Sequence, residues 1–162
     1  MATVRGGRLQ WLAVAIATAI VAVDQLVKDL LIASLKPHES VDFIGGVVRL
    51  YLTYNDSAAF SIGYGQTWIF AIISTLASLG LLWYLPRLET RSWSVMGGVA
   101  LGGMVGNLVD RLIREPGFGH GQVVDYLQIP FNFPIFNLAD MAIVTVAILT
   151  VIRVLRGNKI GK

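Results

Sequence analysis

The stretch IFNLADMAIVTVAILTVI, residues 135–152, decides the fold class of this chain. An apolar run of about 18 to 20 residues is long enough to cross the hydrocarbon core of a bilayer as a helix. Asp140 nevertheless lies near the first turn of this run. An ionised side chain at the centre of a bilayer costs about 3 kcal/mol on insertion scales, so an acid in such a segment is a candidate for function.

Three more apolar segments precede it, at about residues 9–35, 68–85 and 92–113. Of the 162 residues, 55% are hydrophobic and 14% are charged, and the mean hydropathy of +0.66 is too high for an ordinary soluble domain. The segments are expected to be helices, because open sheet edges cannot face lipid. We therefore expect an all-α membrane protein with four transmembrane helices, forming one integral membrane domain over residues 1–162.

The first segment has an alternative interpretation. Arg5 and Arg8 precede a short uncharged run, residues 9–23, which is also typical of a cleaved signal peptide. No convincing A-x-A cleavage site follows, and apolar residues resume after Asp29. These features favour a retained membrane span.

The basic residues predict the topology. They flank the spans in three clusters: Arg5 and Arg8, Arg87 and Arg91, and Arg153, Arg156, Lys159 and Lys162. All three clusters fall on one side of the membrane, so the positive-inside rule predicts that both termini are cytoplasmic. Residues 36–67 and 114–134 then form loops on the outer side.

The first outer loop has strand character. Residues 48–54 alternate in polarity, and Gly45-Gly46 suits a turn from residues 41–44. We expect a small extracytoplasmic β element on the membrane surface. The second outer loop is rich in proline and glycine, so we expect it to be irregular and long enough to fold Asp125 back over the helices.

Asp125 and Asp140 are the sharpest candidate pair. Two nearby carboxylates cannot both ionise cheaply, so one tends to keep a proton while the other loses it. Such a pair can activate water as a base and protonate a leaving amine as an acid. In the alternative interpretation, Asp140 or Asn137 only caps the fourth helix, and Asp125 is a solvated loop acid.

Other polar residues lie inside the predicted spans. Asp24 and Lys28 are four residues apart, in the order that favours a helical ion pair, and a structural pairing is the simpler interpretation. In the third span, Gly98, Gly102 and Gly106 form two overlapping GxxxG motifs, which allow a neighbouring helix to approach closely.

Four polar residues follow these glycines on one broad face: Asn107, Asp110, Arg111 and Arg114. Asp110 and Arg114 can form an ion pair, while Asn107 and Arg111 can hydrogen-bond a substrate backbone or head group. The segment NDSAAF, residues 55–60, joins the β element to the second span and could be a simple Asx turn or helix cap.

The composition argues against other classes of site. The chain has no cysteine, and its two histidines, His38 and His120, are in predicted loops, so a zinc site is not expected. The basic residues adjoin membrane spans instead of forming a solvated patch, so nucleic acid is not an expected partner. We expect no metal and no cofactor.

Five blocks of the sequence resemble lipoprotein signal peptidase, or signal peptidase II, a family of bacterial membrane aspartic peptidases. They are DQLVK at 24–28, NDSAAF at 55–60, GGMVGNLVDR at 102–111, VVD at 123–125 and FNLAD at 136–140. Each block is weak alone, but all five occur in the family's order, and the match extends over nearly the whole chain.

The resemblance implies that Asp125 and Asp140 are the catalytic dyad. It implies a substrate that is a prolipoprotein whose lipobox cysteine carries diacylglycerol, cleaved just before that cysteine. We expect a bacterial cytoplasmic membrane location with the site toward the outer face, contact with membrane lipids, and a monomer.

The resemblance assigns further roles and shows one departure. The residues matching the substrate cleft are Asn55, Asn107, Arg111 and Asn137, and those matching its supporting polar positions are Asp24, Lys28 and Asp110. Ser57 stands where the family usually has glycine, and serine prefers negative φ where glycine need not.

Two other function classes remain on sequence alone. A proton- or ion-coupled carrier could relay protons through Asp24, Asp110 and Asp140, but no acid follows Met141 to complete a path inward. A non-catalytic scaffold would explain the glycines but not the acids. Cleavage of a lipidated substrate would separate a peptidase from both.

Overall fold

A computed structural model describes residues 2–57 and 65–161, with only the backbone considered for residues 2–6. Ala58, Ala59 and Phe60, which belong to the NDSAAF block, lie outside the described residues. The described chain contains four long helices, α1 (Ala2–Ser34), α2 (Thr67–Tyr84), α3 (Arg91–Ile113) and α4 (Leu138–Leu155). All four are long and apolar enough to cross a membrane, which confirms the predicted fold class.

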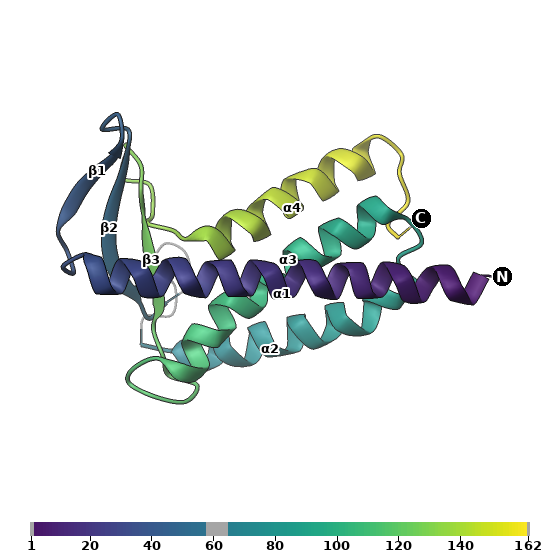
Figure 1. Cartoon of the computed structure of the whole chain (residues 1–162), viewed down its shortest axis with the longest axis horizontal. Helices are drawn as coiled ribbons and strands as arrows, with labels where there is room; N and C mark the ends of the chain where they lie inside the picture. Colours follow the sequence, from purple (N-terminus) through teal and green to yellow (C-terminus); the bar gives the residue numbers. More distant parts are fainter. Residues whose placement is uncertain (1, 58–64, 162) are drawn as a thin grey trace.

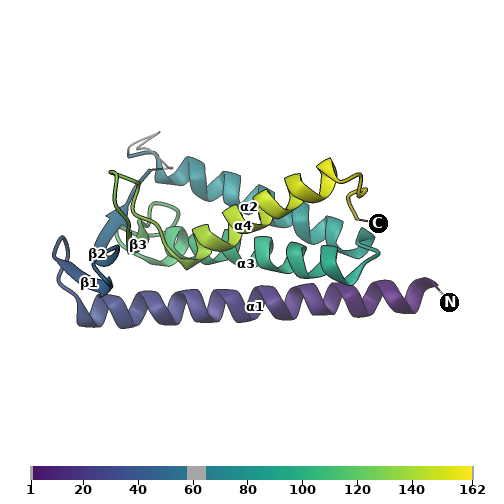
Figure 2. The same ribbon diagram turned by 90° about the horizontal axis from the view of Figure 1, so that it is seen from above.

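Helix α3 lies at the centre of the bundle and packs against α1, α2 and α4 (Figures 1 and 2). Its glycines allow this close packing. A Cβ atom added to Gly98 would lie 2.5 Å from the Ala13 carbonyl oxygen, and one added to Gly102 would lie 2.7 Å from Cβ of Ile20. The GxxxG motifs therefore serve the contact between α3 and α1.

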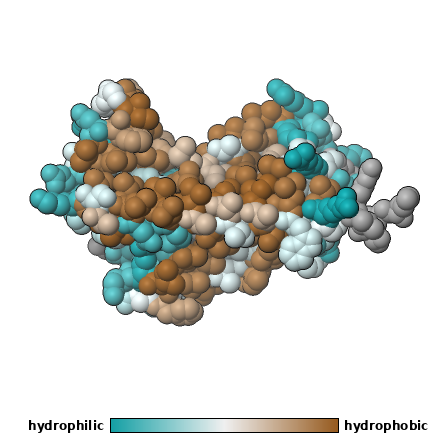
Figure 3. All heavy atoms as spheres, in the orientation of Figure 1, coloured by the Kyte–Doolittle hydropathy of each residue, from teal (hydrophilic) through white to brown (hydrophobic). Residues whose placement is uncertain are grey.

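The surface of the helices is apolar where a lipid would meet it. Ile72, Ile73 and Leu76 of α2 each expose more than half of their surface. In Figure 3, hydrophobic residues cover much of the body of the molecule, and hydrophilic residues gather at its two ends. A soluble protein rarely leaves so large an apolar surface uncovered, so this pattern fits a protein that spans a membrane.

A three-stranded antiparallel sheet lies at one end of the bundle, and both chain termini lie at the other (Figure 1). Its strands, in spatial order, are β1 (Ser40–Ile44), β2 (Val48–Asn55) and β3 (Val123–Gln128). Gly45 and Gly46 have φ values of 54° and 71° and form the turn between β1 and β2, as predicted.

The third strand corrects the expectation that residues 114–134 are irregular throughout. Val123 to Gln128 pairs with β2, placing Asp125 opposite Thr53. Half of the segment, Val123, Val124 and Tyr126, is β-branched or aromatic, and such residues fit a pleated, half-buried surface. It also satisfies the edge of β2 that would otherwise be unpaired.

Several helix ends differ from the predicted bounds, most of all the start of α1, at Ala2 instead of about residue 9, and α4 also ends three residues later than predicted, at Leu155. Helix α4 begins at Leu138, not near residue 135, because Phe136 pairs with Leu127 of β3 and Asn137 caps the helix. After α2 ends at Tyr84, the chain makes one short 3₁₀ turn, η2 (Leu85–Arg87), which contains Pro86.

Candidate active site

Asp125 is placed by strand β3 and is almost completely buried, with 2% of its surface exposed. Its carboxylate accepts two hydrogen bonds from asparagine side chains. Asn55 Nδ2 donates to Oδ2 at 2.8 Å, and Asn137 Nδ2 donates to Oδ1 at 2.6 Å. The interpretation of Asp125 as a solvated loop acid is therefore wrong, because the pairing of β3 with β2 carries it inside.

Asp140 is placed by the N-terminus of α4. Its backbone N–H donates to Asn137 Oδ1 at 2.9 Å, and its Oδ2 accepts from the backbone N–H of Asn137 at 3.2 Å, forming a capping box. Its Oδ1 accepts from Asn107 Nδ2 at 2.7 Å. The predicted capping role is thus correct, and it leaves the carboxylate beside Asp125.

Asn137 joins the two aspartates directly. Its side-chain nitrogen donates to Asp125, while its side-chain oxygen and backbone N–H bind Asp140. Asn137 is itself fully buried. This single residue therefore sets where one carboxylate lies relative to the other.

The environment of Asp125 favours its protonated form. Burial raises the pKa of this carboxyl group to about 7, and the nearby negative charge of Asp140 adds to the rise. The hydrogen bonds from Asn55 and Asn137 and the positive charge of Lys28 act in the opposite direction. An acid with such a pKa can hold or release a proton near neutral pH.

A buried ionic network lies next to this pair. Lys28 Nζ is 2.7 Å from Asp24 Oδ2 and 2.7 Å from Asp110 Oδ2, and all three side chains are fully buried. The predicted pairing of Asp24 with Lys28 is present, and Lys28 also neutralises Asp110. Asp110 forms its predicted ion pair with Arg114 as well, at 2.7 Å.

The two carboxylates of this network hold the backbone beside each candidate catalytic aspartate. Asp24 Oδ1 accepts from the N–H of Ala139 at 3.1 Å, and Asp110 Oδ2 accepts from the N–H of Val124 at 3.1 Å. Ala139 precedes Asp140, and Val124 precedes Asp125. Lys28 thus links the supports of both halves of the site.

Gln25 is also a member of this network, although the sequence patterns assigned it no role. Its Nε2 donates to Gly106 O and to Asp110 Oδ1, both at 3.1 Å, and its Oε1 accepts from Arg114 Nη2 at 3.2 Å. Its role could have been predicted from its position next to Asp24 in a membrane span, where a polar amide needs hydrogen-bond partners.

The predicted substrate-contacting residues all surround the aspartates. Asn55, Asn107 and Asn137 each donate a side-chain N–H to one of the two carboxylates. Arg111 is buried, and its Nη1 donates to Asn107 O at 3.3 Å. Its Nε has no hydrogen-bond partner within the described part of the chain, so it retains a donor for another group.

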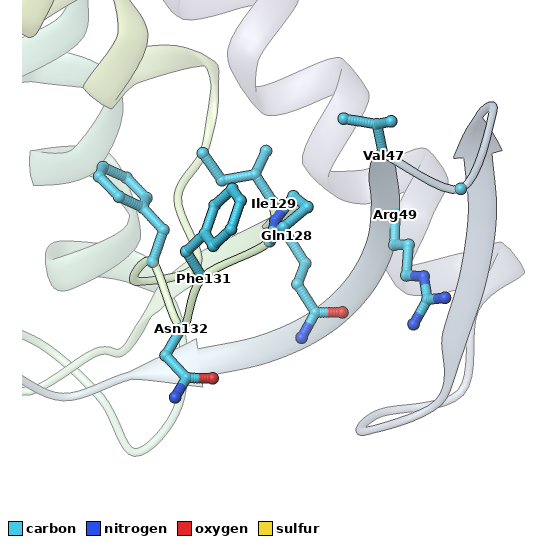
Figure 4. Close-up of a pocket in the computed structure, with 9 residues that line it drawn as sticks. Val47, Arg49, Gln128, Ile129, Phe131 and Asn132 are labelled. Carbon is cyan, nitrogen blue, oxygen red and sulfur yellow. The ribbon is translucent and has the colours of Figure 1, made fainter.

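A surface pocket of about 310 Å³ lies at the opposite end of strands β2 and β3 from Asp125 (Figure 4). Figure 4 shows Val47 and Arg49 on one side of it and Phe131 and Asn132 on the other. Its lining contains none of the predicted site residues.

A metal site is a separate question. Across residues 2–57 and 65–161, no three His, Asp or Glu side chains are grouped to hold a metal ion.

The sequence profile of the signal peptidase (SPase) II family matches residues 16–156, which include every residue of the site. The chain belongs to the signal peptidase II family. It is therefore a peptidase, of the aspartic type known for this family, and the resemblance noted from the five sequence blocks is confirmed.

Individual relatives agree with the family assignment. The lipoprotein signal peptidase of Leifsonia xyli subsp. xyli is 44% identical over 151 residues, which cover 93% of this chain and 69% of the relative. That of Mycobacterium avium is 40% identical over 141 residues, covering 87% and 77%.

The fold is also similar to solved structures of a bacterial membrane enzyme. Two of them superpose with TM-scores of 0.80 and 0.78 at 26% sequence identity. The first covers 89% of this chain and 87% of the solved chain, and the second covers 90% and 94%. The bundle and its terminal sheet therefore form an arrangement shared with a known enzyme.

Proposed function

We propose that Asp125 and Asp140 form the catalytic pair with which this chain removes the signal peptide from diacylglyceryl-modified prolipoproteins, cutting just before the lipidated cysteine. Removal of signal peptides from prolipoproteins is the activity of the family to which the chain belongs. The observation that carries the assignment of the pair is the binding of both carboxylates by one buried asparagine, Asn137.

The pair supports hydrolysis by general acid–base catalysis. The ionised carboxylate takes a proton from a water molecule while that water attacks the carbonyl carbon of the scissile peptide bond. The protonated carboxyl group then gives its proton to the leaving amine as the carbon–nitrogen bond breaks. The products are a free carboxyl group on the signal peptide and a free amino group on the lipidated cysteine.

The proton inventory of the site suits this scheme. Two close carboxylates share a proton because ionising both is unfavourable. The raised pKa of Asp125 keeps a proton available at the pair up to about pH 7. The two residues titrate as a unit, so the proton is a property of the pair.

We propose that Asn55, Asn107, Arg111 and Asn137 contact the substrate peptide as it enters. The positions of the three asparagines support this role, because each already donates a hydrogen bond to one carboxylate of the proposed pair. We propose no substrate contact for Asp24, Lys28 and Asp110. They support the pair by holding the backbone next to each of its aspartates.

The chain is a multi-pass bacterial membrane protein, and we propose its orientation from charge. The positive-inside rule favours both termini in the cytoplasm, which fits their shared location at the end of the bundle away from the sheet. The sheet, whose strands belong to the outer segments 36–67 and 114–134, and the two aspartates then lie toward the outer face. We further propose that one membrane domain, residues 1–162, acts as a monomer among membrane lipids.

This location explains why a lipid on the substrate would matter. The acyl chains anchor the cysteine at the membrane boundary, at the same depth as the proposed pair, so that binding energy from the lipid positions the scissile bond. A carrier or a scaffold would not cleave a prolipoprotein, whether or not its cysteine carries the lipid.

The test is the cleavage of two otherwise identical precursors by purified protein in the same detergent. Mass spectrometry of the products should place the cut just before the cysteine. The kcat/KM for the diacylglyceryl-modified precursor should exceed that for the precursor with an unmodified cysteine by at least about 100-fold, which corresponds to roughly 3 kcal/mol of positioning energy. Comparable values would contradict the role given to the lipid, and absence of cleavage would contradict the function.

A further inference from the structure

Ser57 follows strand β2 by two residues and is buried, with 6% of its surface exposed. Two of its donors converge on one atom. Its backbone N–H and its side-chain hydroxyl each donate to Asn55 Oδ1 at 3.0 Å. The hydroxyl adds a donor that a glycine at this position would not have.

These two bonds determine which way the Asn55 amide points. The oxygen of an asparagine side chain only accepts hydrogen bonds, and its nitrogen only donates them. With the oxygen held by Ser57, the nitrogen is directed away from Ser57, and it donates to Asp125 Oδ2 at 2.8 Å. A reversed amide would place its oxygen against a carboxylate oxygen of Asp125 and its nitrogen against the Ser57 N–H, so two of these three bonds would be lost.

The other carboxylate of the pair has a similar support. Asn107 Nδ2 donates to Asp140 Oδ1 at 2.7 Å, and Asn107 Oδ1 is held by Lys28 Nζ and Asn137 Nδ2, both at 3.1 Å. Each carboxylate therefore accepts from an asparagine whose oxygen is held by two donors.

We propose that Ser57 is a positioning residue of the peptidase, whose hydroxyl fixes the amide of Asn55 and through it the carboxylate of Asp125. The proposal rests on the proposed function of Asp125. Without the hydroxyl, the Asn55 oxygen keeps only the backbone donor, so the amide and the carboxylate it holds occupy the productive geometry less often. The larger loss falls on kcat, because the carboxylate that Asn55 holds is the reacting group. KM should change less, because Ser57 itself makes no proposed contact with the substrate.

The experiment compares Ser57→Ala and Ser57→Gly with the wild-type protein, using the lipidated precursor. Both variants should lower kcat about three- to tenfold, the range expected from losing a hydrogen bond worth roughly 1 kcal/mol, with KM within about twofold of wild type. The Tm in detergent should fall by no more than a few degrees, as expected for the loss of one hydrogen bond. If the alanine variant does not fold, the smaller glycine variant answers the same question.

Ser94 provides a matched control. It is also a buried serine whose hydroxyl makes a local hydrogen bond, donating to Thr90 O at 3.1 Å, but it lies in the first turn of α3, at the far end of the bundle from Asp125. Ser94→Ala should therefore retain the wild-type kcat.

A double variant separates positioning from a general structural role. In an Asn55→Ala background, Ser57→Ala should cause no further loss of kcat, because the amide through which it acts is absent. Losses that multiply would overturn the proposal, and so would a wild-type kcat for Ser57→Ala. Neither result would bear on the proposed function. That function is tested separately, by cleavage of the lipidated precursor and by the Asp125 and Asp140 variants.

Discussion

The carboxylate of Asp24 accepts a hydrogen bond from the backbone N–H of Ala139 at 3.1 Å, joining helix α1 to the residue just before Asp140. Asp110 makes the equivalent bond to Val124, just before Asp125, and Lys28 lies between the two carboxylates. The positions of the proposed catalytic residues thus depend on an ionic network that does not itself contact the scissile bond.

Replacing Lys28 should be the most disruptive change in this network. Lys28→Met keeps most of the side-chain volume but leaves Asp24 and Asp110 buried without their shared cation, which should reduce the free energy of unfolding by about 3–5 kcal/mol. Adding Asp24→Asn should recover part of this loss, because one unpaired charge is removed. Thermal unfolding of the single and double variants in one detergent measures both effects.

Arg49→Met is the matched control for the loss of a cation. Its ion pair with Asp42 is solvent-exposed, with 51% and 70% of the side-chain surfaces accessible, so the cost should be no more than about 1 kcal/mol. Equal Tm losses for the Lys28 and Arg49 variants would show that the buried network is not a determinant of stability.

Gly98→Ala should destabilise the contact between α1 and α3. Its new Cβ would lie 2.5 Å from the Ala13 carbonyl oxygen and 3.0 Å from Cβ of Ile16, so the helices must separate. Such overpacking costs about 1–3 kcal/mol.

Gly80→Ala on α2 isolates this effect from helix propensity. A Cβ at Gly80 meets no other atom within 4 Å, so the substitution should raise the free energy of unfolding by up to about 1 kcal/mol. The difference in Tm between the two variants is the informative quantity. A Gly98 variant as stable as the Gly80 variant would mean that α1 and α3 do not pack closely.

Activity should fall as the pH rises above neutrality. The pKa of Asp125 is raised from its ordinary value of 3.8 to about 7, so the pair keeps its proton up to about pH 7 and loses its general acid above it. A pH profile of kcat with the lipidated precursor should therefore show a descending limb near pH 7.

The asparagine bonds allow a check on this assignment. The hydrogen bond from Asn55 lowers the pKa of Asp125, so Asn55→Ala should move the descending limb to higher pH as well as reducing kcat. A limb that stays in place, or moves to lower pH, would argue that another group limits activity.

Much of this fold was predictable because a bilayer leaves few choices. A span of about 20 apolar residues must satisfy its backbone internally, so the four helices follow from hydropathy alone. The β1–β2 hairpin follows from alternating polarity around Gly45 and Gly46. Strand β3 could not be predicted in this way. It pairs with β2, and even the nearest pair, Asn55 and Val123, is 68 residues apart in the sequence, so local patterns do not indicate the pairing.

The candidate site shows the same limit. The spacing of Asp24 and Lys28 predicted their pairing because both residues are on one helix. The Asx turn expected for residues 55–60 is present, because the Ser57 N–H donates to Asn55 Oδ1. Nothing local predicted that Asn55 would then bind Asp125, or that Lys28 would also bind Asp110 and Asn107. Those contacts depend on how three helices and a sheet meet, and that geometry comes from packing as a whole.

The central claim is that Asp125 and Asp140 do the chemistry. Asp125→Asn and Asp140→Asn preserve shape and one of the two hydrogen bonds that each carboxylate accepts, but they remove the proton transfer. Each should therefore lower kcat by at least about 100-fold with the protein still folded. Asp42→Asn, which changes an exposed acid of strand β1, should leave kcat unchanged.

The measurement that tests this most directly is single-turnover cleavage of the lipidated precursor by these three variants in one detergent, alongside wild type. We expect loss of cleavage for the Asp125 and Asp140 variants and wild-type cleavage for the Asp42 variant. Retention of a tenth or more of wild-type turnover by either of the first two would contradict it.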